Sequence, residues 1–301
     1  MTGAAPVWQI YLKLTLAAVF WGGTFIAGKL LAGQVPPFSA AFLRFLLATL
    51  VLLLLCRQYN GSLPRLGRDD LLPILFLGLS GVFAYNAFFF AGLNWIEAGR
   101  AAVIVANNPV MIALFAALLF GEKLTSRTVL GIGLSVAGAV IVVIRGDVSQ
   151  LVGGGVGRGE LLIFGCVLSW TTYSLVGRRA MRNLSPLVAV TCSAAAGTLL
   201  LAPFALGEGL LSQVWFYSLE AWVSLIYLAL FGTVIGFVWY YQGIMRLGST
   251  RAGQFINFVP IAAVALSVGL LGEPLTSSLL AGLLLVCSGL YLTNRTVSPK
   301  S

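Results

Sequence analysis

Runs of about 20 predominantly apolar residues recur from one end of the chain to the other, separated by short polar or glycine- and proline-containing joints. Only 9% of the 301 residues are charged, whereas 59% are hydrophobic. Soluble domains carry roughly a quarter charged residues, so this chain cannot build a solvated surface of the ordinary kind. The sequence therefore predicts an integral membrane protein.

Each run is long enough for a helix that crosses the hydrocarbon core of a bilayer. Helices are expected because backbone polar groups in lipid must pair within their own segment, and the runs do not alternate as barrel strands do. The first run is too long, and too closely followed by others, to be a cleaved signal peptide. We expect an all-α membrane protein with ten transmembrane helices. Their approximate spans are residues 10–31, 37–56, 71–93, 98–120, 128–144, 159–178, 186–206, 220–242, 250–271 and 277–294.

The distribution of positive charge predicts the orientation of the chain. With ten spans both termini lie on the same side of the membrane. If that side is the cytoplasm, thirteen of the 18 Lys and Arg residues lie inside, four lie outside and Arg44 lies within a span. This bias predicts that both termini are cytoplasmic. The basic residues form no patch despite a net charge of +9, so no nucleic-acid partner is expected.

Several kinds of chemistry are excluded. The chain has no histidine, which removes histidine-based metal sites, nucleophilic pairs and proton relays. Cys56, Cys166, Cys192 and Cys287 lie in or at the end of apolar runs without paired spacing, and we interpret them as packing residues. The glycine-rich stretch at 145–159 lacks the Lys-Ser/Thr of a phosphate-binding loop and is interpreted as a linker. We therefore expect no cofactor, no metal and no ATP-driven pump.

An internal repeat divides the chain into two halves. Many residues of the first half recur 151 or 149 positions later. The pairs at a shift of 151 are Gly81–Gly232, Gly92–Gly243, Arg100–Arg251, Pro109–Pro260, Gly121–Gly272, Glu122–Glu273, Leu124–Leu275, Thr125–Thr276, Gly131–Gly282 and Gly138–Gly289, and those at 149 are Trp21–Trp170 and Pro37–Pro186. We expect one five-helix copy at residues 1–150 and a second at 151–301. Since five is odd, the second copy enters the membrane inverted, as in many secondary transporters, with a cavity between the copies.

Two prolines indicate where such a cavity lies. Pro109 and Pro260 occupy matching positions near the middle of spans four and nine. Proline removes a backbone donor and disturbs the preceding turn, which frees carbonyl groups that must find partners or line a wet cavity. We interpret the pair as cavity-related hinges; the alternative is a tolerated kink far from any substrate.

Amide side chains stand beside both prolines. Asn107 and Asn108 precede Pro109, and Gln254 and Asn257 precede Pro260. Amides are costly against lipid, so these side chains are expected to face inward. They are candidates for substrate contact, and hydrogen bonds that hold neighbouring helices together explain them equally well.

Two tryptophans lie near mid-span, whereas tryptophan in membrane proteins normally gathers at the interface. Trp21 and Trp170 are repeat partners, and each has a polar or aromatic residue three positions later on the same helix face. Aromatic rings combined with amides and hydroxyls suit small amphipathic molecules. The candidate substrate-binding residues on this basis are Trp21, Thr24, Tyr85, Asn86, Trp170 and Tyr173.

Arg44 is the only basic residue well inside a span, and such residues are functional candidates by default. It can hold a substrate carboxylate; the alternative is that it extends to the interface or pairs structurally with helix-end carbonyls. Glu122 and Glu273 lie at span ends, where capping explains them. No acidic residue is expected at mid-membrane depth, so facilitated diffusion or exchange is favoured over proton coupling.

These motifs resemble the drug/metabolite transporter superfamily, and within it the EamA-type carriers, among them the YddG-type amino-acid exporters. The resemblance covers nearly the whole chain. The motifs that carry it are Phe20-Trp21-Gly22-Gly23-Thr24-Phe25, Arg44, Pro109, Gly121-Glu122-Lys123-Leu124-Thr125, Gly131 and Gly138, with Pro260, Gly272-Glu273-Pro274-Leu275-Thr276, Gly282 and Gly289 in the second half. Two departures are that Ser193 stands at the position matching Arg44 and that Trp170 alone remains of the span-one motif. They suggest functional asymmetry between the halves.

The resemblance implies a ten-helix bundle with a central cavity, alternating access, and export of amino acids, including aromatic ones, or related metabolites across the bacterial cytoplasmic membrane. Its partners would be a small-molecule substrate and the lipid bilayer; the oligomeric state stays open. A multidrug or nucleotide-sugar carrier of the same superfamily is the nearest alternative, and a pore is another. A membrane-embedded lipid-modifying enzyme is disfavoured because the chain offers no catalytic cluster near a headgroup interface.

Overall fold

A computed structural model describes residues 7–60, 66–121, 125–147, 156–180, 184–247, 252 and 255–294. Every regular element among them is helical, as the apolar runs predict. The α-helices are α1 (Val7–Leu31), α2 (Pro37–Asn60), α3 (Arg68–Leu77), α4 (Tyr85–Leu93), α5 (Ala98–Val105), α6 (Asn108–Phe120), α7 (Ser126–Val143), α9 (Arg158–Ala180), α10 (Pro186–Gly207), α11 (Leu210–Gln213), α12 (Leu219–Ala229), α13 (Gly236–Leu247), α15 (Phe258–Leu271) and α16 (Ser277–Asn294). Two π-helical segments, η1 (Gly78–Ala84) and η3 (Leu230–Ile235), and two 3₁₀ turns, η2 (Val214–Phe216) and η4 (Phe255–Asn257), complete the set.

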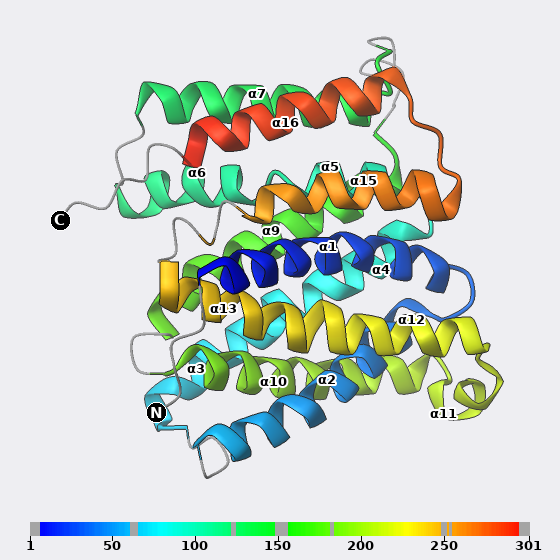
Figure 1. Cartoon of the computed structure of the whole chain (residues 1–301). Helices are drawn as coiled ribbons and strands as arrows, with labels where there is room; N and C mark the ends of the chain where they lie inside the picture. Colours follow the sequence, from blue (N-terminus) through cyan, green and yellow to red (C-terminus); the bar gives the residue numbers. More distant parts are fainter. Residues whose placement is uncertain are drawn as a thin grey trace.

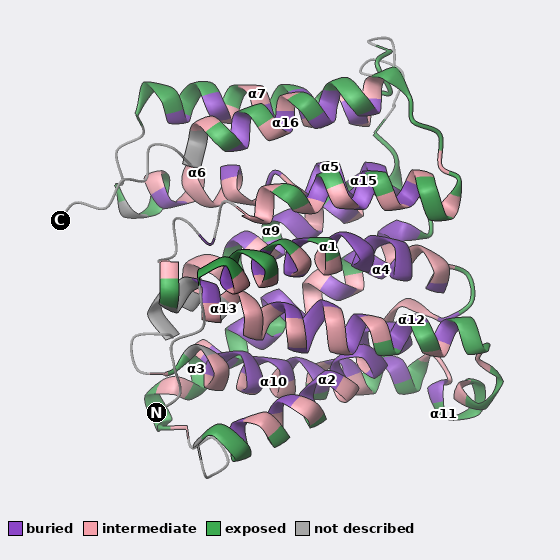
Figure 2. Ribbon diagram, in the orientation of Figure 1, coloured by how far each residue is buried: buried purple, intermediate pink, exposed green. Residues whose placement is uncertain are grey.

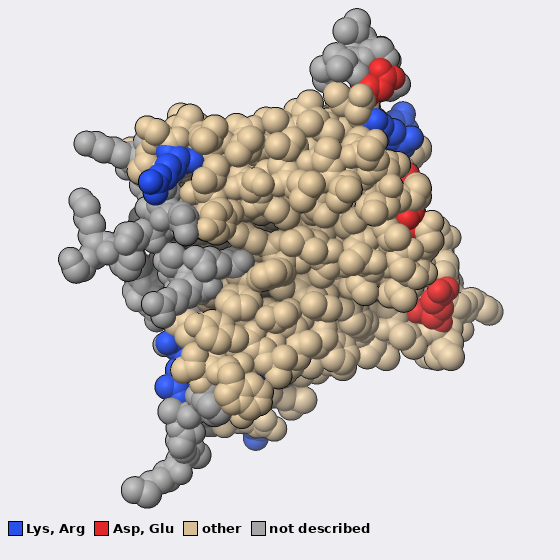
Figure 3. Space-filling model, turned by 45° about the horizontal axis from the view of Figure 1, so that its top comes forward, with Lys and Arg blue, Asp and Glu red and all other residues tan. Residues whose placement is uncertain are grey.

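Eight helical segments in these ranges are long and apolar enough to cross a membrane. Two further apolar helices, Phe255–Leu271 and Ser277–Leu292, are shorter. On the face shown in Figure 3 the visible charged side chains gather at two opposite ends, with a wide uncharged band between them. These features identify a multi-pass membrane protein. The exact count of ten spans stays a prediction, because two of the segments fall short of the length of a full span.

Corresponding helices of the two halves run in opposite directions (Figure 1). α1 and α9 enter the bundle from opposite ends, as do α2 and α10, and the start of α1 lies at the same end as the end of α16. The pairings obey the same relation: α1 packs on α15 while α9 packs on α5 and α6. α1 corresponds to α9 in the repeat, and α15 corresponds to the segment formed by α5 and α6. The two pairings are therefore the same contact made once from each half, as expected of an inverted repeat. The copy boundaries at 1–150 and 151–301 stay predictions.

The backbone repeats its irregularities as well as its helices. η1 interrupts the third apolar segment and η3 interrupts the corresponding segment of the second half. Gly121 and Gly272 each end a helix in the left-handed conformation with φ 66° and ψ 22°, where glycine carries no steric penalty. The predicted span at 98–120 is divided, because α5 ends at Val105 and α6 begins at Asn108.

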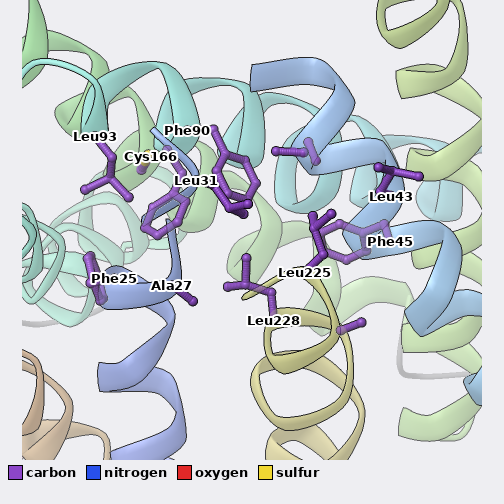
Figure 4. Close-up of a cluster of buried hydrophobic side chains, with 14 of the residues drawn as sticks. Phe25, Ala27, Leu31, Leu43, Phe45, Phe90, Leu93, Cys166, Leu225 and Leu228 are labelled. Atoms are coloured by element: carbon purple, nitrogen blue, oxygen red, sulfur yellow. The ribbon is translucent and has the colours of Figure 1, made fainter. Parts of the chain in front are cut away.

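Buried side chains concentrate where helices of both halves meet (Figure 2). Figure 4 shows part of the largest apolar cluster, in which Phe25 and Leu31 of α1 lie near Phe90 of α4 and Leu228 of α12. Exposed apolar side chains cover the outward faces of the helices, as lipid contact requires. The cluster therefore joins the two halves around the middle of the bundle.

α7 and α16 pack against each other through glycines. A Cβ atom added at Gly138 of α7 would lie 2.7 Å from the carbonyl oxygen of Gly282 in α16, closer than real Cβ contacts. Small residues allow this close backbone approach, which drives helix association in lipid.

Replacing Gly138 with alanine should destabilise the protein by about 1–3 kcal/mol, because the added methyl group has to separate two backbones. The matched control is Gly133→Ala on the same helix, where nothing lies within 4 Å of the added Cβ. That variant should be neutral or slightly stabilising, since alanine favours helix. Unfolding in detergent titrated with SDS measures both; equal stability of the two variants would contradict the packing argument.

Candidate functional site

A small cavity lies between helices of both halves, near the middle of the bundle. Its lining residues are Arg44, Phe45, Gly81, Val82, Tyr85, Asn86, Trp170, Tyr173, Val190, Ser193, Ala194, Thr233 and Phe237. They come from α2, η1 and α4 of the first half and from α9, α10, η3 and α13 of the second. The site therefore lies between the two halves, as an inverted-repeat carrier requires.

Arg44 provides the charge of the cavity. Its side chain is only 8% exposed, yet its Nη1 donates a hydrogen bond to Asn86 Oδ1 at 2.9 Å and its Nε contacts Thr233 Oγ1 at 3.4 Å. Asn86 is held in place because its Nδ2 donates to the Val82 carbonyl at 2.8 Å, which turns Oδ1 toward the arginine. Both partners of the guanidinium are neutral, and a guanidinium carries five N–H donors. Most of its donor capacity thus stays available inside the cavity.

Aromatic rings form a wall of the same cavity. Trp170 stacks on Tyr173 with ring centroids 5.1 Å apart, meets Tyr85 edge-on at 5.6 Å and lies 6.4 Å from Phe237. Tyr173 packs directly on Gly81, where any Cβ atom would overlap its ring. Gly81 in η1 therefore leaves room for the Tyr173 ring, and the aromatic wall presents an apolar surface beside the Arg44 cation.

Each of the two π-helical segments contributes residues to the lining of the cavity. Gly81 and Val82 belong to η1, and Thr233 belongs to η3, where its Oγ1 donates to the Leu228 carbonyl at 3.0 Å. A π-helical turn widens the helix and changes the direction of the side chains that follow, which is why such turns recur at functional sites. Here the repeat brings both of them to the same cavity.

The cavity encloses about 50 Å³. A water molecule needs roughly 10–15 Å³ of such space, and sites for small organic molecules measure about 300–1,000 Å³. The cavity as it stands has room for a few waters but not for a small organic solute. Admission of a solute requires the lining helices to move apart.

Five of the predicted site residues meet at this cavity: Arg44, Tyr85, Asn86, Trp170 and Tyr173. Two further predicted site residues, Trp21 and Thr24, do not line the cavity.

Trp21 Nε1 donates to the Gly232 carbonyl at 3.0 Å, and its ring meets Phe237 edge-on at 5.6 Å. Thr24 Oγ1 donates to the Trp21 carbonyl at 2.6 Å. Trp21 thus packs against Phe237 without itself lining the cavity.

The residues around the first proline lie elsewhere. Asn107 is 7% exposed and its Nδ2 donates to the carbonyls of Val103 and Ile104 at 3.2 and 3.3 Å, so it closes the end of α5. Asn108 begins α6 and Pro109 is its second residue, a position that a helix tolerates well. None of the three lines the cavity. The interruption of the span that Pro109 indicated is therefore present, and it separates α5 from α6.

In the second half, Asn257 ends the turn η4 and Pro260 is buried in the first turn of α15. Neither lines the cavity. Gln254 lies outside the described residues.

Several lining residues were not among the predicted site residues, and the repeat could have indicated two of them. Phe237 stands 151 positions after Asn86, and Ser193 stands 149 positions after Arg44. Applying the repeat shift to the first-half candidates would therefore have added these two residues. Thr233 corresponds to Val82, which was not a candidate, so the shift would not have indicated it.

Two carboxylates at the end of the bundle opposite the start of α1 cap the N-termini of helices. Glu273 accepts the backbone N–H groups of Ala98 and Gly99 at 2.7 and 3.0 Å, which caps α5. Glu208 caps α2 in the same way through Ser39 at 2.7 Å. Both caps reach from the second half to the first and stabilise helix N-termini. The capping interpretation of Glu273 is confirmed, while Glu122 lies outside the described residues.

A buried ion pair also joins the halves. Arg100 Nη2 lies 2.7 Å from Glu160 Oε1, both side chains are 7% exposed, and Arg100 also donates to the Val143 carbonyl. The charge distribution gave Arg100 no partner, and the structure shows it buried beside Glu160. Its partner is 60 residues away, so no local pattern indicated the pair.

Two oppositely oriented halves around an enclosed cavity lined by an arginine and aromatic rings define a membrane transport protein of the inverted-repeat type. The chain belongs to the EamA-like transporter family, whose model matches it twice, over residues 8–144 and 157–295. The resemblance inferred from its motifs is thereby confirmed, and the protein is a transporter and not an enzyme.

Individual relatives match along nearly their full length. The chain is 28% identical to the uncharacterized transporter YyaM of Bacillus subtilis, covering 93% of this chain and 92% of that protein. It is 26% identical to the probable amino-acid metabolite efflux pump of Salmonella typhimurium, covering 92% of each. A solved crystal structure shares its fold with a TM-score of 0.65 at 22% identity, over 95% of this chain and 96% of the other.

Proposed function

We propose that this transporter exports amino acids, including aromatic ones, and related small metabolites across the bacterial cytoplasmic membrane by alternating access. The observation that carries the proposal is the pairing of Arg44 with an aromatic wall in one enclosed cavity. A guanidinium binds carboxylates through parallel hydrogen bonds, and the rings receive an apolar side chain. The name of the Salmonella relative, an amino-acid metabolite efflux pump, supports the same substrate class.

In this proposal the two halves form ten spans with both termini in the cytoplasm, and the lining helices separate alternately toward each side. Arg44, Tyr85, Asn86, Trp170 and Tyr173 contact the solute. Trp21 supports Phe237, and Thr24 is hydrogen-bonded to the Trp21 carbonyl. The breaks beside Pro109 and Pro260 act as hinges, with the amides Asn107, Asn108, Gln254 and Asn257 near them.

The energetic mode is facilitated diffusion or exchange. The carboxylates Glu208 and Glu273 cap helices, and Glu160 is paired with Arg100. These groups are committed to structural contacts, which leaves no free carboxylate beside the cavity among the described residues to carry a proton.

Counterflow in proteoliposomes tests the proposal. Vesicles loaded with an unlabelled amino acid should accumulate the same labelled amino acid transiently, and uptake should saturate. A pore would show neither counterflow nor saturation. Exchange of cationic drugs or nucleotide sugars without exchange of any amino acid or related metabolite would favour the alternative carriers of the superfamily and overturn the proposal.

Replacing Trp170 with alanine should lower kcat/KM for aromatic substrates about tenfold, since an aromatic pair contributes about 0.5–1.5 kcal/mol beyond the burial of its area. Trp170→Phe keeps a ring and should retain most activity. Trp21→Ala should lower transport as well, through loss of support for Phe237. The measurement is counterflow normalised to the protein inserted; loss of folding in both alanine variants would instead assign the tryptophans a packing role.

A further inference from the structure

Among the residues that the structure describes, one charged group lines the cavity, and it is positive. Arg44 is the only ionised side chain among the lining residues. The described acidic residues all lie at helix ends or in the joints between helices, where several cap helices or form ion pairs. They are Asp69, Asp70, Glu97, Asp147, Glu160, Glu208, Glu220 and Glu273. Glu122, the ninth acidic residue of the sequence, lies outside the described residues.

A buried cation with only neutral partners is energetically costly in a membrane protein. Asn86 and Thr233 supply oxygen atoms to Arg44, but neither supplies a negative charge. A bound carboxylate would complete the pair in a cavity where water is scarce, and this is where a charged hydrogen bond contributes most. The arrangement thus favours a ligand that brings its own negative charge.

The same arrangement disfavours a ligand that also brings a positive charge. In a 2-amino acid the ammonium group is attached to the carbon next to the carboxylate, so binding at Arg44 would hold two cations within a few ångströms of each other. The ammonium would lose its hydration and meet aromatic rings, hydroxyls and an amide, with no carboxylate among the lining residues. Like charges at such a distance repel each other strongly in a medium of low dielectric constant.

We infer that the preferred substrate is an aromatic carboxylate with a net charge of −1, rather than the zwitterionic amino acid with the same skeleton. This inference rests on the proposed function and, within its substrate class, favours the related anionic metabolites over the amino acids themselves. Phenyl- and indolyl-alkanoates and aromatic 2-oxo acids have the required chemistry: a ring for the wall of Trp170 and Tyr173, and a single anionic group for Arg44.

An anionic substrate also supplies a driving force for export. The cytoplasmic side of a bacterial membrane is electrically negative, so the membrane potential drives anions outward. One elementary charge that crosses 100 mV changes the equilibrium distribution by about 50-fold. Export of a monoanion thus needs no proton-carrying carboxylate, whereas a zwitterion gains nothing from the potential.

The decisive comparison uses labelled 3-phenylpropanoate and labelled L-phenylalanine, which share the ring and the carbon skeleton and differ only in the ammonium group. The full chain is reconstituted in vesicles, and each compound is measured by counterflow at a pH well above the pKa of the carboxyl group. Vesicles without protein correct for passive diffusion of the acid, and 2-phenylethanesulfonate repeats the measurement with a permanently ionised group.

We expect kcat/KM for 3-phenylpropanoate to exceed that for phenylalanine about tenfold or more. A potassium diffusion potential, negative inside, should accelerate efflux of 3-phenylpropanoate and leave efflux of phenylalanine unchanged. Equal or faster exchange of phenylalanine would overturn the inference and leave the proposed function standing. If neither compound is exchanged, and no other amino acid or metabolite is, the proposed function fails and the inference fails with it.

Discussion

Replacing Arg44 with glutamine should lower kcat/KM for carboxylate substrates about 100-fold. A hydrogen bond to a charged group contributes about 1.5–3 kcal/mol, and every 1.4 kcal/mol is a factor of ten. Glutamine retains polarity and can still reach a neighbouring oxygen, but it carries no charge and has no planar pair of donors. Counterflow with a labelled carboxylate, normalised to the inserted protein, measures the loss.

Arg44→Lys is the matched control for charge. Lysine keeps the cation but donates from a single point instead of a planar fork, so transport should fall only to an intermediate level. If the glutamine variant stays within about threefold of the unchanged protein, Arg44 does not bind the substrate.

The stability of the same variants separates binding from a structural role. Because Arg44 is buried with neutral partners only, removing its charge should leave the free energy of unfolding unchanged or raise it. If instead the arginine serves chiefly to hold α2 to Asn86 and Thr233, the glutamine variant should be clearly less stable. Unfolding in SDS-titrated detergent, in the absence of substrate, distinguishes the two cases.

The largest loss of stability is expected for Arg100→Met. This change leaves the carboxylate of Glu160 buried without its partner, which costs about 3–5 kcal/mol. The double variant Arg100→Met/Glu160→Leu removes both charges and should recover most of that loss. SDS-titrated unfolding of the two single variants and of the double variant gives the coupling energy.

Arg145 and Glu97 provide a matched control on the same side of the protein. Their side chains are 68% and 42% exposed and their charged atoms lie 4.0 Å apart. Because exposed pairs contribute about 0–1 kcal/mol, Arg145→Met should change stability by a small amount only. If Arg100→Met and Arg145→Met lower the free energy of unfolding by similar amounts, burial does not determine what the Arg100–Glu160 pair contributes to stability.

The helical segments and their correspondence between the two halves could be predicted from the sequence, because a lipid environment strongly restricts which sequences can cross it. A backbone in hydrocarbon must form continuous helices, so apolar runs marked the segments. The shift of 151 residues paired Gly121 with Gly272, and the structure shows that both end corresponding helices in the same conformation. The divided helix at Ala106 and Asn107 was indicated by Pro109, though as a hinge within one helix and not as a break between two.

The cavity could be predicted only in part, because side-chain direction depends on local backbone geometry. Arg44, Tyr85 and Trp170 were identified since charged, phenolic and indole groups at mid-span are conspicuous. Thr233 and Phe237 were missed because they lie in or just after a π-helical turn, where regular helical spacing no longer gives the facing direction. Trp21 has the same chemistry as Trp170, but its ring packs against Phe237 and does not line the cavity.

The contact between α7 and α16 limits how this transporter can move. Gly138 and Gly282 bring the two backbones together, and Gly289 of α16 packs on Ser135 of α7 in the same manner. Surfaces that interlock at backbone distance resist sliding and rolling, because any shift drives a carbonyl into the neighbouring chain. We therefore expect the fifth and tenth apolar segments to move together as one rigid unit, and the rearrangement that opens the cavity to take place among the remaining helices.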